Sequence, residues 1–265
     1  MTISPQRIKT CCADAYSSDI IGLLLGECYH PGGVGLTHLL GEALGLGCGA
    51  RRLADVACGR GASARLLAGE YPALTVDGVD LSEVNVEHAR AAAAASGLAQ
   101  RVRFHRGDAE RLPLPDNAFD ALVCECALCT FPNKNAAAQQ FARILRPGGL
   151  AGITDVTITD AGLPAELTTL AAWAACIAGA RSVTGYTAIL AGAGLRTRRT
   201  DSHDGSLLKM IDRIEARVTA LRIAAPHMLA DNGIQPDAVL THTRLVRDAV
   251  KAGRLGYTLI IAEKT

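Results

Sequence analysis

The fold class of this 265-residue chain follows from the segment Asp55-Val56-Ala57-Cys58-Gly59-Arg60-Gly61. The segment continues an apolar run that indicates a buried strand over Arg52–Ala57, and a helical pattern follows it over Ala62–Glu70. Gly59 and Gly61 permit a tight turn and a close approach of a ligand to the backbone, beside the free N–H groups of the helix. A Gly-x-Gly turn between a strand and a helix predicts a nucleotide-binding loop, and it is also compatible with a dinucleotide.

Beyond this loop, strand and helix patterns alternate along the chain. The further strands are expected at Thr75–Asp80, Val102–His105, Ala118–Cys124, Leu150–Val156, Arg196–Ser202 and Tyr257–Glu263. The further helices are expected at Leu36–Leu44, at Glu83–Ala95 with Ser82 as its N-cap, and at Ala136–Leu145, which Pro147-Gly148-Gly149 terminates. This alternation predicts an α/β fold with a doubly wound, mostly parallel sheet of seven strands.

We expect three regions that fold as one continuous globular unit. Residues 1–50 form an N-terminal helical cap, which the segment His30-Pro31-Gly32-Gly33 interrupts. Residues 51–156 form the nucleotide-binding core, and residues 157–265 add acceptor-side helices and the last strands. About fifty residues between the last two strands have a helical pattern, and we expect this insertion to cover the acceptor pocket.

The composition indicates a globular protein without a polyanionic partner. Apolar residues make up 49% of the chain and the net charge is +1, with no cluster of Lys and Arg. There is thus no electrostatic reason to expect nucleic acid or an anionic membrane as a partner. The N-terminus has no apolar signal core, and the longest apolar stretch, Leu167–Ala180, is shorter than the roughly 20 residues that cross a bilayer. We therefore expect a soluble, cytoplasmic protein that acts on a small molecule, in an oligomeric state that the sequence leaves open.

Three acidic residues indicate the chemistry of the ligand more specifically than the glycine loop does. Asp55 lies four residues before Gly59, where a dinucleotide site has an apolar residue because the anionic pyrophosphate binds nearby. Asp80 ends the second strand, where a carboxylate can accept hydrogen bonds from ribose hydroxyls, and Asp108 ends the third, where it can meet an adenine amino group. Each acid alone is compatible with a loop cap, but three at successive strand ends predict a cationic nucleoside ligand at one edge of the sheet.

These segments resemble the motifs of the class I S-adenosylmethionine-dependent methyltransferases. The resemblance spans about residues 50–155 and rests on Asp55-x-Ala57-x-Gly59-x-Gly61, Val79-Asp80-Leu81-Ser82, Gly107-Asp108-Ala109-Glu110 with Leu112-Pro113, Phe119-Asp120-Ala121-Leu122 and Leu145-Arg146-Pro147-Gly148-Gly149. It implies a Rossmann-like fold with S-adenosylmethionine as the cofactor, Asp80 at the ribose, Asp108 and Ala109 at the adenine, and the two glycines at the methionine moiety. Cys58 departs from the family pattern, which has a small or polar residue there.

Nine cysteines suggest that the methyl acceptor is a soft atom. The fourth strand continues into Cys124-Glu125-Cys126-Ala127-Leu128-Cys129, and alternation along an extended chain predicts that Cys124 and Cys126 face the same side. Thiolates bind thiophilic centres such as trivalent arsenic, whose lone pair can attack a methyl group in line. For methylation of oxygen or nitrogen a thiol cluster has no use, and it oxidises easily.

Other interpretations of the cysteines stay open. A free cysteine often fills a core, which is our prediction for Cys28, Cys48 and Cys58. A structural zinc site would need a second C-x-x-C motif, which the chain lacks. A thioredoxin-like role for Cys126 and Cys129 would need the motif at the start of a helix early in the fold.

The cysteine loop resembles that of the arsenite methyltransferases. In that family a cysteine follows the fourth strand and an Asn/Asp-Lys pair closes the segment, and the corresponding residues here are Cys126 and Asn133-Lys134. Cys176-Ile177-Ala178-Gly179-Ala180 is similar to the family's later segment, which carries the other ligand. The resemblance implies Cys126 and Cys176 as ligands of the metalloid substrate, with Cys11-Cys12 loosely similar to the family's N-terminal cysteines. The segment His30-Pro31-Gly32-Gly33 and the helical insertion do not fit the family and indicate a divergent subgroup.

Three functions follow as hypotheses. The leading one is methylation of a thiol-bound metalloid, with a thiol reductant as a further partner. The others are methylation of oxygen, nitrogen or carbon in a small molecule, and sensing of S-adenosylmethionine or a metalloid without turnover. The predicted cofactor-binding residues are Asp55, Ala57, Gly59, Gly61, Asp80, Leu81, Asp108, Ala109 and Cys124. The predicted catalytic residues are Cys124, Cys126, Cys129 and Cys176, and those predicted to contact the substrate are Cys11, Cys12, His30 and Glu125.

Overall fold

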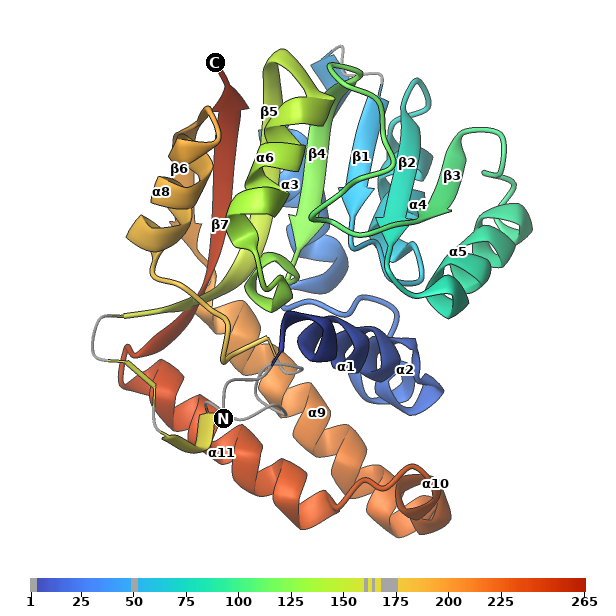
Figure 1. Ribbon diagram of the computed structural model, residues 1–265. Coiled ribbons are helices and arrows are strands. Elements are labelled where there is room, and N and C mark those ends of the chain that lie inside the picture. Colours follow the sequence, from blue (N-terminus) through green and yellow to red (C-terminus); the bar gives the residue numbers. More distant parts are fainter. Residues whose placement is uncertain (1–3, 49–51, 160–161, 164, 168–175) are drawn as a thin grey trace.

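One seven-stranded sheet organises the molecule. The computed structural model describes residues 4–48, 52–159, 162–163, 165–167 and 176–265, and the strand order is β3-β2-β1-β4-β5-β7-β6 (Figure 1). The strands are β1 (Arg52–Val56), β2 (Thr75–Asp80), β3 (Val102–Arg106), β4 (Phe119–Glu125), β5 (Leu145–Ile158), β6 (Leu195–Ser202) and β7 (Leu255–Lys264). β7 runs antiparallel to both of its neighbours, and the other neighbouring pairs are parallel. The doubly wound, mostly parallel sheet that the sequence predicts is therefore confirmed.

Helices cover both faces of this sheet and the edge at which the parallel strands end (Figure 1). The α-helices are α1 (Pro5–Ser17), α2 (Asp19–Leu25), α3 (Gly33–Ala43), α4 (Ala62–Glu70), α5 (Glu83–Ala95), α6 (Lys134–Ile144), α8 (Val183–Gly192), α9 (Asp204–Ala224), α10 (Pro226–Asp231) and α11 (Pro236–Lys251). Single turns of 3₁₀-helix are η1 (Leu46–Cys48), η2 (Leu128–Thr130) and η3 (Ala165–Leu167). Helices α3, α4 and α5 share one core with the sheet, and α6 and α8 share the other. Helices α1, α2 and α9–α11 lie beyond the carboxyl ends of β1, β2 and β4 (Figure 1).

Alternating side chains of the strands build the two cores. Leu53 of β1 packs in the core of Leu40 and Leu67, whereas the next residue, Ala54, packs in the opposite core with Phe141. All five of these residues have no exposed surface. Burying a leucine contributes roughly 1.5–3 kcal/mol, so a shift of one residue in register would expose several such side chains and is strongly disfavoured.

Helix α6 and strand β5 both begin earlier in the sequence than predicted, and no loop separates them. Asn133 caps the helix, because its side chain accepts a hydrogen bond from the N–H of Ala136 at 3.0 Å, and the helix therefore starts at Lys134. The helix ends at Ile144, and β5 starts at Leu145. The pairing of β5 with β4 is irregular just after this point, so Pro147-Gly148-Gly149 is a bulged part of the strand rather than a loop before it.

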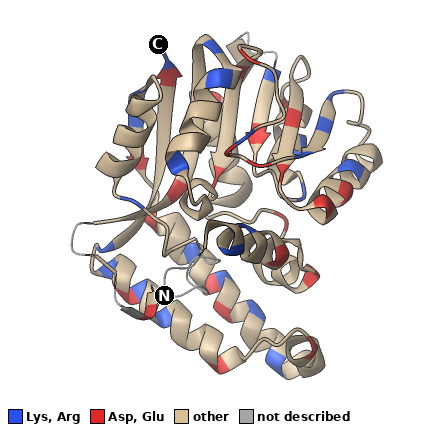
Figure 2. Ribbon diagram, in the orientation of Figure 1, with Lys and Arg blue, Asp and Glu red and all other residues tan. Residues whose placement is uncertain are grey.

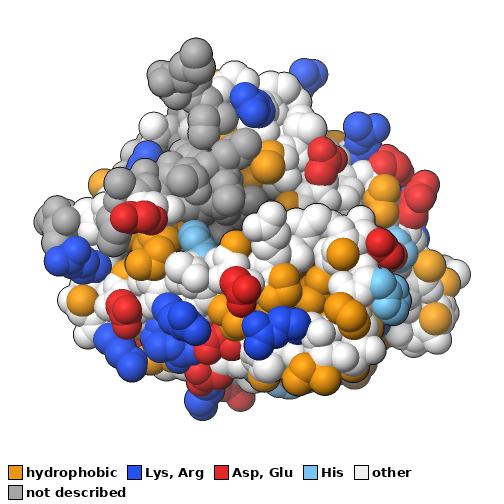
Figure 3. Space-filling model, turned by 90° about the horizontal axis from the view of Figure 1, so that it is seen from below, with side chains coloured by type: hydrophobic (Ala, Val, Ile, Leu, Met, Phe, Trp, Pro, Cys, Tyr) orange, Lys and Arg blue, Asp and Glu red, His pale blue; other side chains and the backbone are white. Residues whose placement is uncertain are grey.

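Charges of both signs are spread over the described surface (Figure 2). In the view from below, hydrophobic side chains lie between basic and acidic ones (Figure 3). Within the described ranges, no helix has both the length and the apolar character needed to cross a bilayer. The apolar stretch Leu167–Ala180 lies mostly outside the described residues, which omit 168–175.

Candidate cofactor and acceptor site

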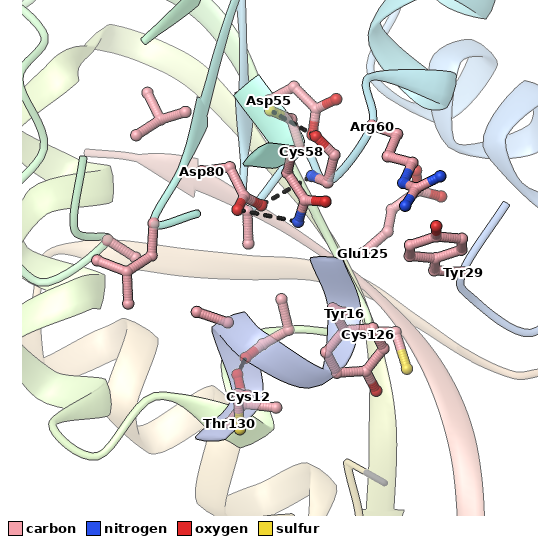
Figure 4. A pocket seen from close by; sticks show the side chains of 18 of the residues that line it. Cys12, Tyr16, Tyr29, Asp55, Cys58, Arg60, Asp80, Glu125, Cys126 and Thr130 are labelled. Carbon is pink, nitrogen blue, oxygen red and sulfur yellow. Dashed lines mark hydrogen bonds between the residues drawn. The ribbon is translucent and has the colours of Figure 1, made fainter. Parts of the chain in front are cut away.

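A cavity lies where β1, β2 and β4 end, and helix α1 forms one of its walls (Figures 1 and 4). Its empty space, with the open mouth included, is about 1100 Å³. Its walls include most residues that the sequence predicts for the cofactor, namely Asp55, Ala57, Gly59, Asp80, Leu81, Asp108 and Ala109. Of the predicted substrate residues it includes Cys12, His30 and Glu125. Of the predicted catalytic residues it includes Cys126, whereas Cys129 and Cys176 do not line it.

The loop after β1 is a tight turn with left-handed backbone at three residues. Ala57, Gly59 and Gly61 have φ angles of 60°, 53° and 73°. The N–H of Gly61 donates to the carbonyl of Cys58 at 2.9 Å, which closes the turn before α4. A Cβ atom at Gly61 would lie 2.5 Å from the Phe104 ring, so this position needs glycine for packing as well as for backbone conformation. Gly61 does not line the cavity, so its predicted contact with the cofactor is not seen.

Asp80 is held at the end of β2 by backbone donors. One carboxylate oxygen accepts from the N–H of Gly59 at 2.9 Å, and the other accepts from the N–H of Ser82 at the same distance. Burial raises the pKa of the Asp80 carboxyl above its usual value, although these hydrogen bonds oppose the shift. The side-chain amide of Asn85 also donates to Oδ1 at 3.3 Å, so Oδ2 keeps a lone pair with which Asp80 can accept a hydrogen bond from a ribose hydroxyl. Figure 4 shows its side chain at the cavity wall.

Asp55 has an unpaired carboxyl oxygen next to a second acid. Its side chain is 3% exposed, and its Oδ2 atom has no hydrogen-bond partner among the described residues. Burial raises the pKa of the Asp55 carboxyl well above its usual value, and the nearby Glu125 raises it further. Two buried carboxylates without a cation are costly, so this part of the cavity fits a positively charged ligand. The ammonium and sulfonium groups of S-adenosylmethionine meet that requirement.

Glu125 belongs to a buried polar cluster that reaches across the cavity. Its carboxylate accepts from the hydroxyls of Ser63 at 2.5 Å and Thr37 at 3.1 Å. His30 Nε2 lies 3.6 Å from the same carboxylate, and both side chains are 5% exposed. The structure therefore brings His30 and Glu125 together. Ser63 and Thr37 were not predicted, because a single hydroxyl on a helix gives no pattern in a sequence.

Asp108 has a partner that the sequence does not reveal. Lys9 of α1 donates to Asp108 at 2.7 Å and to Glu110 at 2.6 Å. Although partial burial opposes the shift, these two carboxylates raise the pKa of the Lys9 ammonium overall. Helix α1 is thus attached to the side of the cavity where Ala109, the predicted adenine neighbour, lies.

Three donors converge on Cys176 at the other end of α1. Its sulfur lies 3.1 Å from the hydroxyl of Tyr16 and 3.1 Å from the carbonyl oxygen of Cys126. Hydrogen bonds with the thiols of Cys126 and Cys129 lower the pKa of the Cys176 thiol well below its ordinary value. The contact with the carbonyl oxygen of Cys126 requires that Cys176 is a thiol. The contacts with the Tyr16 hydroxyl and with the thiols of Cys126 and Cys129 favour a thiolate. Cys176 therefore shares one hydrogen-bonded cluster with Tyr16, Cys126 and Cys129.

The backbone at this cluster is unusual. Cys126 and Cys176 have φ angles of 54° and 62°, a region that residues other than glycine rarely adopt. Asp155 of β5 lies beneath them and accepts from the N–H of Cys129 at 2.8 Å. Burial raises the pKa of the Asp155 carboxyl to about 7. Strained backbone and a perturbed acid frequently occur together at functional sites.

The other cysteines correct several predictions. Cys124 points into the core of Leu122 and Phe141 and does not line the cavity, whereas Cys126 packs against the opposite core. The expectation that Cys124 and Cys126 face one side is therefore wrong, because β4 ends at Glu125 and the left-handed backbone of Cys126 interrupts the alternation. Cys11 does not line the cavity.

The three cysteines that we expected in the core also differ from one another. Cys48 is exposed, so its assignment to the core is wrong, whereas Cys58 is buried as expected. Cys28 is partly exposed and, with Cys58, lines the cavity. All nine cysteines are free thiols. Within the described parts of the chain, no three His, Cys, Asp or Glu side chains are grouped so that they could hold a metal ion.

The fold and this cavity define a nucleoside-binding α/β domain of the methyltransferase type. Residues 53–149 match the family model of a methyltransferase domain. The chain thus contains a class I S-adenosylmethionine-dependent methyltransferase domain, and S-adenosylmethionine is its cofactor. These similarities support the methyltransferase domain and do not extend to the narrower resemblance to the arsenite methyltransferases.

The relatives of the chain include enzymes with several organic acceptors. The 27-O-demethylrifamycin SV methyltransferase of Amycolatopsis mediterranei is 34% identical over 167 residues, which are 58% of this chain and 60% of that protein. The chain spans about a quarter to three fifths of the length of the curated relatives it matches.

Solved structures extend the similarity to the whole chain. The [4+2]-cyclase SpnF superposes with a TM-score of 0.79 at 26% identity, covering 99% of this chain and 97% of that one. Phosphoethanolamine N-methyltransferase 2 of Haemonchus contortus, in complex with S-adenosylmethionine, gives a TM-score of 0.82 at 17% identity and covers 99% of this chain and 60% of that one. The latter likeness concerns the fold alone.

Proposed function

We propose that the protein is an enzyme that transfers the methyl group of S-adenosylmethionine to trivalent arsenic or an organoarsenical, held by the thiolates of Cys126 and Cys176. The observation that supports the proposal is the convergence of Cys126, Cys129 and Tyr16 on Cys176, since Cys126 and Tyr16 line the cofactor cavity. When bound, S-adenosylmethionine supplies a methyl group on a sulfonium, which a soft nucleophile accepts by in-line displacement.

Three acidic side chains of this chain hold the cofactor in the proposal. Asp55 and Glu125 give the inner part of the cavity negative charge, which complements the ammonium and the sulfonium. Asp80 accepts a ribose hydroxyl, since its backbone donors fix the carboxylate at the cavity wall. The loop glycine Gly59 leaves the backbone open to the ligand.

The thiols hold the acceptor and orient its lone pair. Cys176 binds as a thiolate because its three donors stabilise the negative charge, and thiolates are the form in which cysteine binds soft centres. Cys126 supplies the second sulfur from the cavity wall. A third sulfur comes from a thiol reductant in solution, which agrees with the lack of a three-residue metal site among the described residues. Nine free thiols favour a reducing compartment such as the cytoplasm.

One assay tests the activity. The purified chain is incubated with S-adenosylmethionine, a reducing thiol and either arsenite or methylarsenite, and methylated arsenicals are separated and measured. We expect methylated product that depends on both the protein and the trivalent metalloid. No arsenical product, together with turnover of an organic acceptor, would refute the metalloid assignment. Cofactor binding without turnover of either class would point to a sensor.

Variants test the ligand assignment separately. We expect Cys126→Ser and Cys176→Ser each to reduce arsenic methylation by about 100-fold or more, because a hydroxyl does not bind a soft centre. Cys48→Ser is the matched control, since Cys48 is exposed and lies outside the cavity. Full arsenic methylation by Cys126→Ser would show that the ligands are elsewhere even if the activity is correct.

A small organic acceptor is the second candidate. It is favoured by the rifamycin relative, whose name describes methylation of an organic molecule and which is 34% identical over 167 residues. In that case the thiols would be part of an apolar wall. A library of phenols, amines and enolisable ketones in the same assay separates the two, because only this candidate gives turnover that Cys126→Ser retains.

A further inference from the structure

The acceptor end of the cofactor cavity has no charged side chain. By this name we mean the part of the wall where helix α1 packs against η2, which contains Cys12, Tyr16, Cys126, Ala127, Thr130 and Phe131. Figure 4 shows Cys12, Tyr16, Cys126 and Thr130 on one side of the cavity, apart from Asp80. Thiols, a methyl group, two hydroxyls and two aromatic rings are therefore the groups that face an acceptor here.

The two hydroxyls at the acceptor end already have partners. The Tyr16 hydroxyl lies 3.1 Å from the Cys176 sulfur, and the Thr130 hydroxyl donates to the carbonyl oxygen of Ala127 at 2.7 Å. Phe131 is half-buried, so part of its ring stays open to a ligand. Burial of apolar surface contributes roughly 25 cal/mol per Å². The surface that remains for the acceptor therefore favours an apolar group.

Acidic side chains outnumber basic ones in the rest of the wall. The described wall has five acids and two bases, namely Glu27, Asp55, Asp80, Asp108 and Glu125 against Lys9 and Arg60. Lys9 is paired with Asp108 at 2.7 Å and with Glu110 at 2.6 Å, and Arg60 is paired with Asp19 at 2.6 Å. Neither base is therefore left to bind an anionic acceptor.

The cofactor does not reverse this balance of charge. S-adenosylmethionine has an ammonium, a sulfonium and a carboxylate, so it adds one net positive charge to a described wall with three acids in excess. His30, whose Nε2 lies 3.6 Å from the Glu125 carboxylate, adds one more when it is protonated. The occupied cavity thus keeps an excess of negative charge, which repels a carboxylate or a phosphate on the acceptor.

We propose that the methyl acceptor presents an uncharged, apolar organic group, such as an aromatic ring, to the acceptor end, and that acceptors with a carboxylate or phosphate are excluded. This inference rests on the proposed function for the position of the acceptor beside Cys126. Among trivalent arsenicals it selects an organoarsenical with an uncharged aryl or alkyl group. The same charge and polarity apply if the acceptor is an organic molecule without arsenic.

A matched pair of arsenicals tests the inference. Phenylarsenous acid and para-carboxyphenylarsenous acid share one scaffold and differ by one negative charge. Each is incubated with the full chain, S-adenosylmethionine and a reducing thiol at low ionic strength, and kcat/KM is measured. We expect kcat/KM to be about 30-fold or more higher for phenylarsenous acid, because an unpaired carboxylate would be buried beside like charges. Equal values would overturn the inference and leave the proposed function in place.

A second arm decides if neither arsenical is methylated, a result that would refute the proposed function. We titrate para-ethylphenol and para-hydroxyphenylpropanoate separately, by calorimetry, into the complex of the chain with S-adenosylhomocysteine. Saturable binding of the phenol that is about tenfold or more tighter than that of the propanoate supports the inference. Equal binding of the two compounds, or binding of neither, overturns it.

A variant of one wall acid tests the electrostatic cause. Glu27 lines the cavity, is exposed, and forms no ion pair among the described residues. We expect Glu27→Lys to reduce the preference for the uncharged member of either pair by about threefold or more at low ionic strength. Glu42→Lys is the matched control, because Glu42 is exposed on α3 and does not line the cavity. An equal preference in these two variants would overturn the exclusion of anions by charge.

Discussion

The turn at Gly61 combines two requirements at one residue. Its φ angle is 73°, and a Cβ atom there would lie 2.5 Å from the Phe104 ring. We expect Gly61→Ala to lower the free energy of unfolding by about 2–4 kcal/mol, because the backbone is strained and the ring must move. Urea denaturation measures this. Gly69→Ala is the control, since Gly69 lies in α4 with open space around it and should be neutral or slightly stabilised.

Asp80 gives a prediction about the cofactor. We expect Asp80→Asn to weaken S-adenosylmethionine binding by roughly 10- to 100-fold, because an amide nitrogen would face the backbone N–H group of Gly59 or Ser82 and the side chain would lose an acceptor for the ribose. Calorimetry measures the Kd. Asp77→Asn on the same strand is the control, because Asp77 pairs with His105 and Arg52 outside the cavity. Equal affinities in both variants would contradict the assignment of the ribose contact.

Asp155 gives a prediction about pH. Burial raises the pKa of its carboxyl from 3.8 to about 7 in the folded state. The folded protein therefore keeps a proton that the unfolded chain loses, and this contribution to the free energy of unfolding falls as the pH rises from about 4 to 7. We expect Asp155→Asn, relative to the unaltered protein, to gain up to about 4 kcal/mol between pH 4 and pH 8. Denaturation at both pH values measures the gain, and a difference that does not change with pH would refute the shift. Asp14→Asn, an exposed site, serves as the control.

At the scale of elements, helix α1 connects two parts of the site. Lys9 binds Asp108 and Glu110 near one end, and Tyr16 contacts Cys176 near the other. We expect Lys9→Gln to increase amide hydrogen exchange over Pro5–Ser17 by about tenfold, because the partly buried ion pairs fix this helix to the core. Exchange measured by mass spectrometry checks this. Arg7→Gln, on the exposed side of α1, should leave exchange unchanged.

Local signals in the sequence predict the elements where those signals are strong. Helix α5 has the predicted bounds, Glu83 and Ala95, because the Ser82 hydroxyl accepts from the N–H of Asn85 and starts the helix there. The shared direction of the parallel strands follows from the alternation of strands and helices. The strand-end acids Asp55, Asp80 and Asp108 reach one cavity for the same reason.

Contacts between distant parts of the chain could not be predicted in this way. Lys9 and Asp108 are 99 residues apart, and Tyr16 and Cys176 are 160 residues apart. The local sequence pattern of helix α1 does not indicate which strand end the helix will cover. The interruption of the side-chain alternation at Cys126 could not be predicted either. A cysteine with a φ angle of 54° is held in that conformation by tertiary contacts rather than by its own preference.

At the scale of the whole molecule, binding of the cofactor should stabilise the fold. A ligand at about 100 times its Kd adds roughly 2.7 kcal/mol to the free energy of unfolding, which corresponds to a rise of about 5–10 °C in Tm for a domain of this size. Thermal denaturation with S-adenosylmethionine or S-adenosylhomocysteine measures this. NAD is the control, because Asp55 next to the loop disfavours a pyrophosphate, and an equal rise with NAD would contradict the cofactor assignment.

The position of β7 has a consequence for biosynthesis. This strand lies between β5 and β6 but follows helices α9, α10 and α11 along the chain. While the ribosome is still making those helices, the edge of β5 has no neighbour and its peptide groups are open to pairing with another nascent chain. The sheet is completed only after Leu255–Lys264 has left the exit tunnel. Slower translation through the helices before β7 therefore prolongs the interval in which the edge of β5 can pair with another chain.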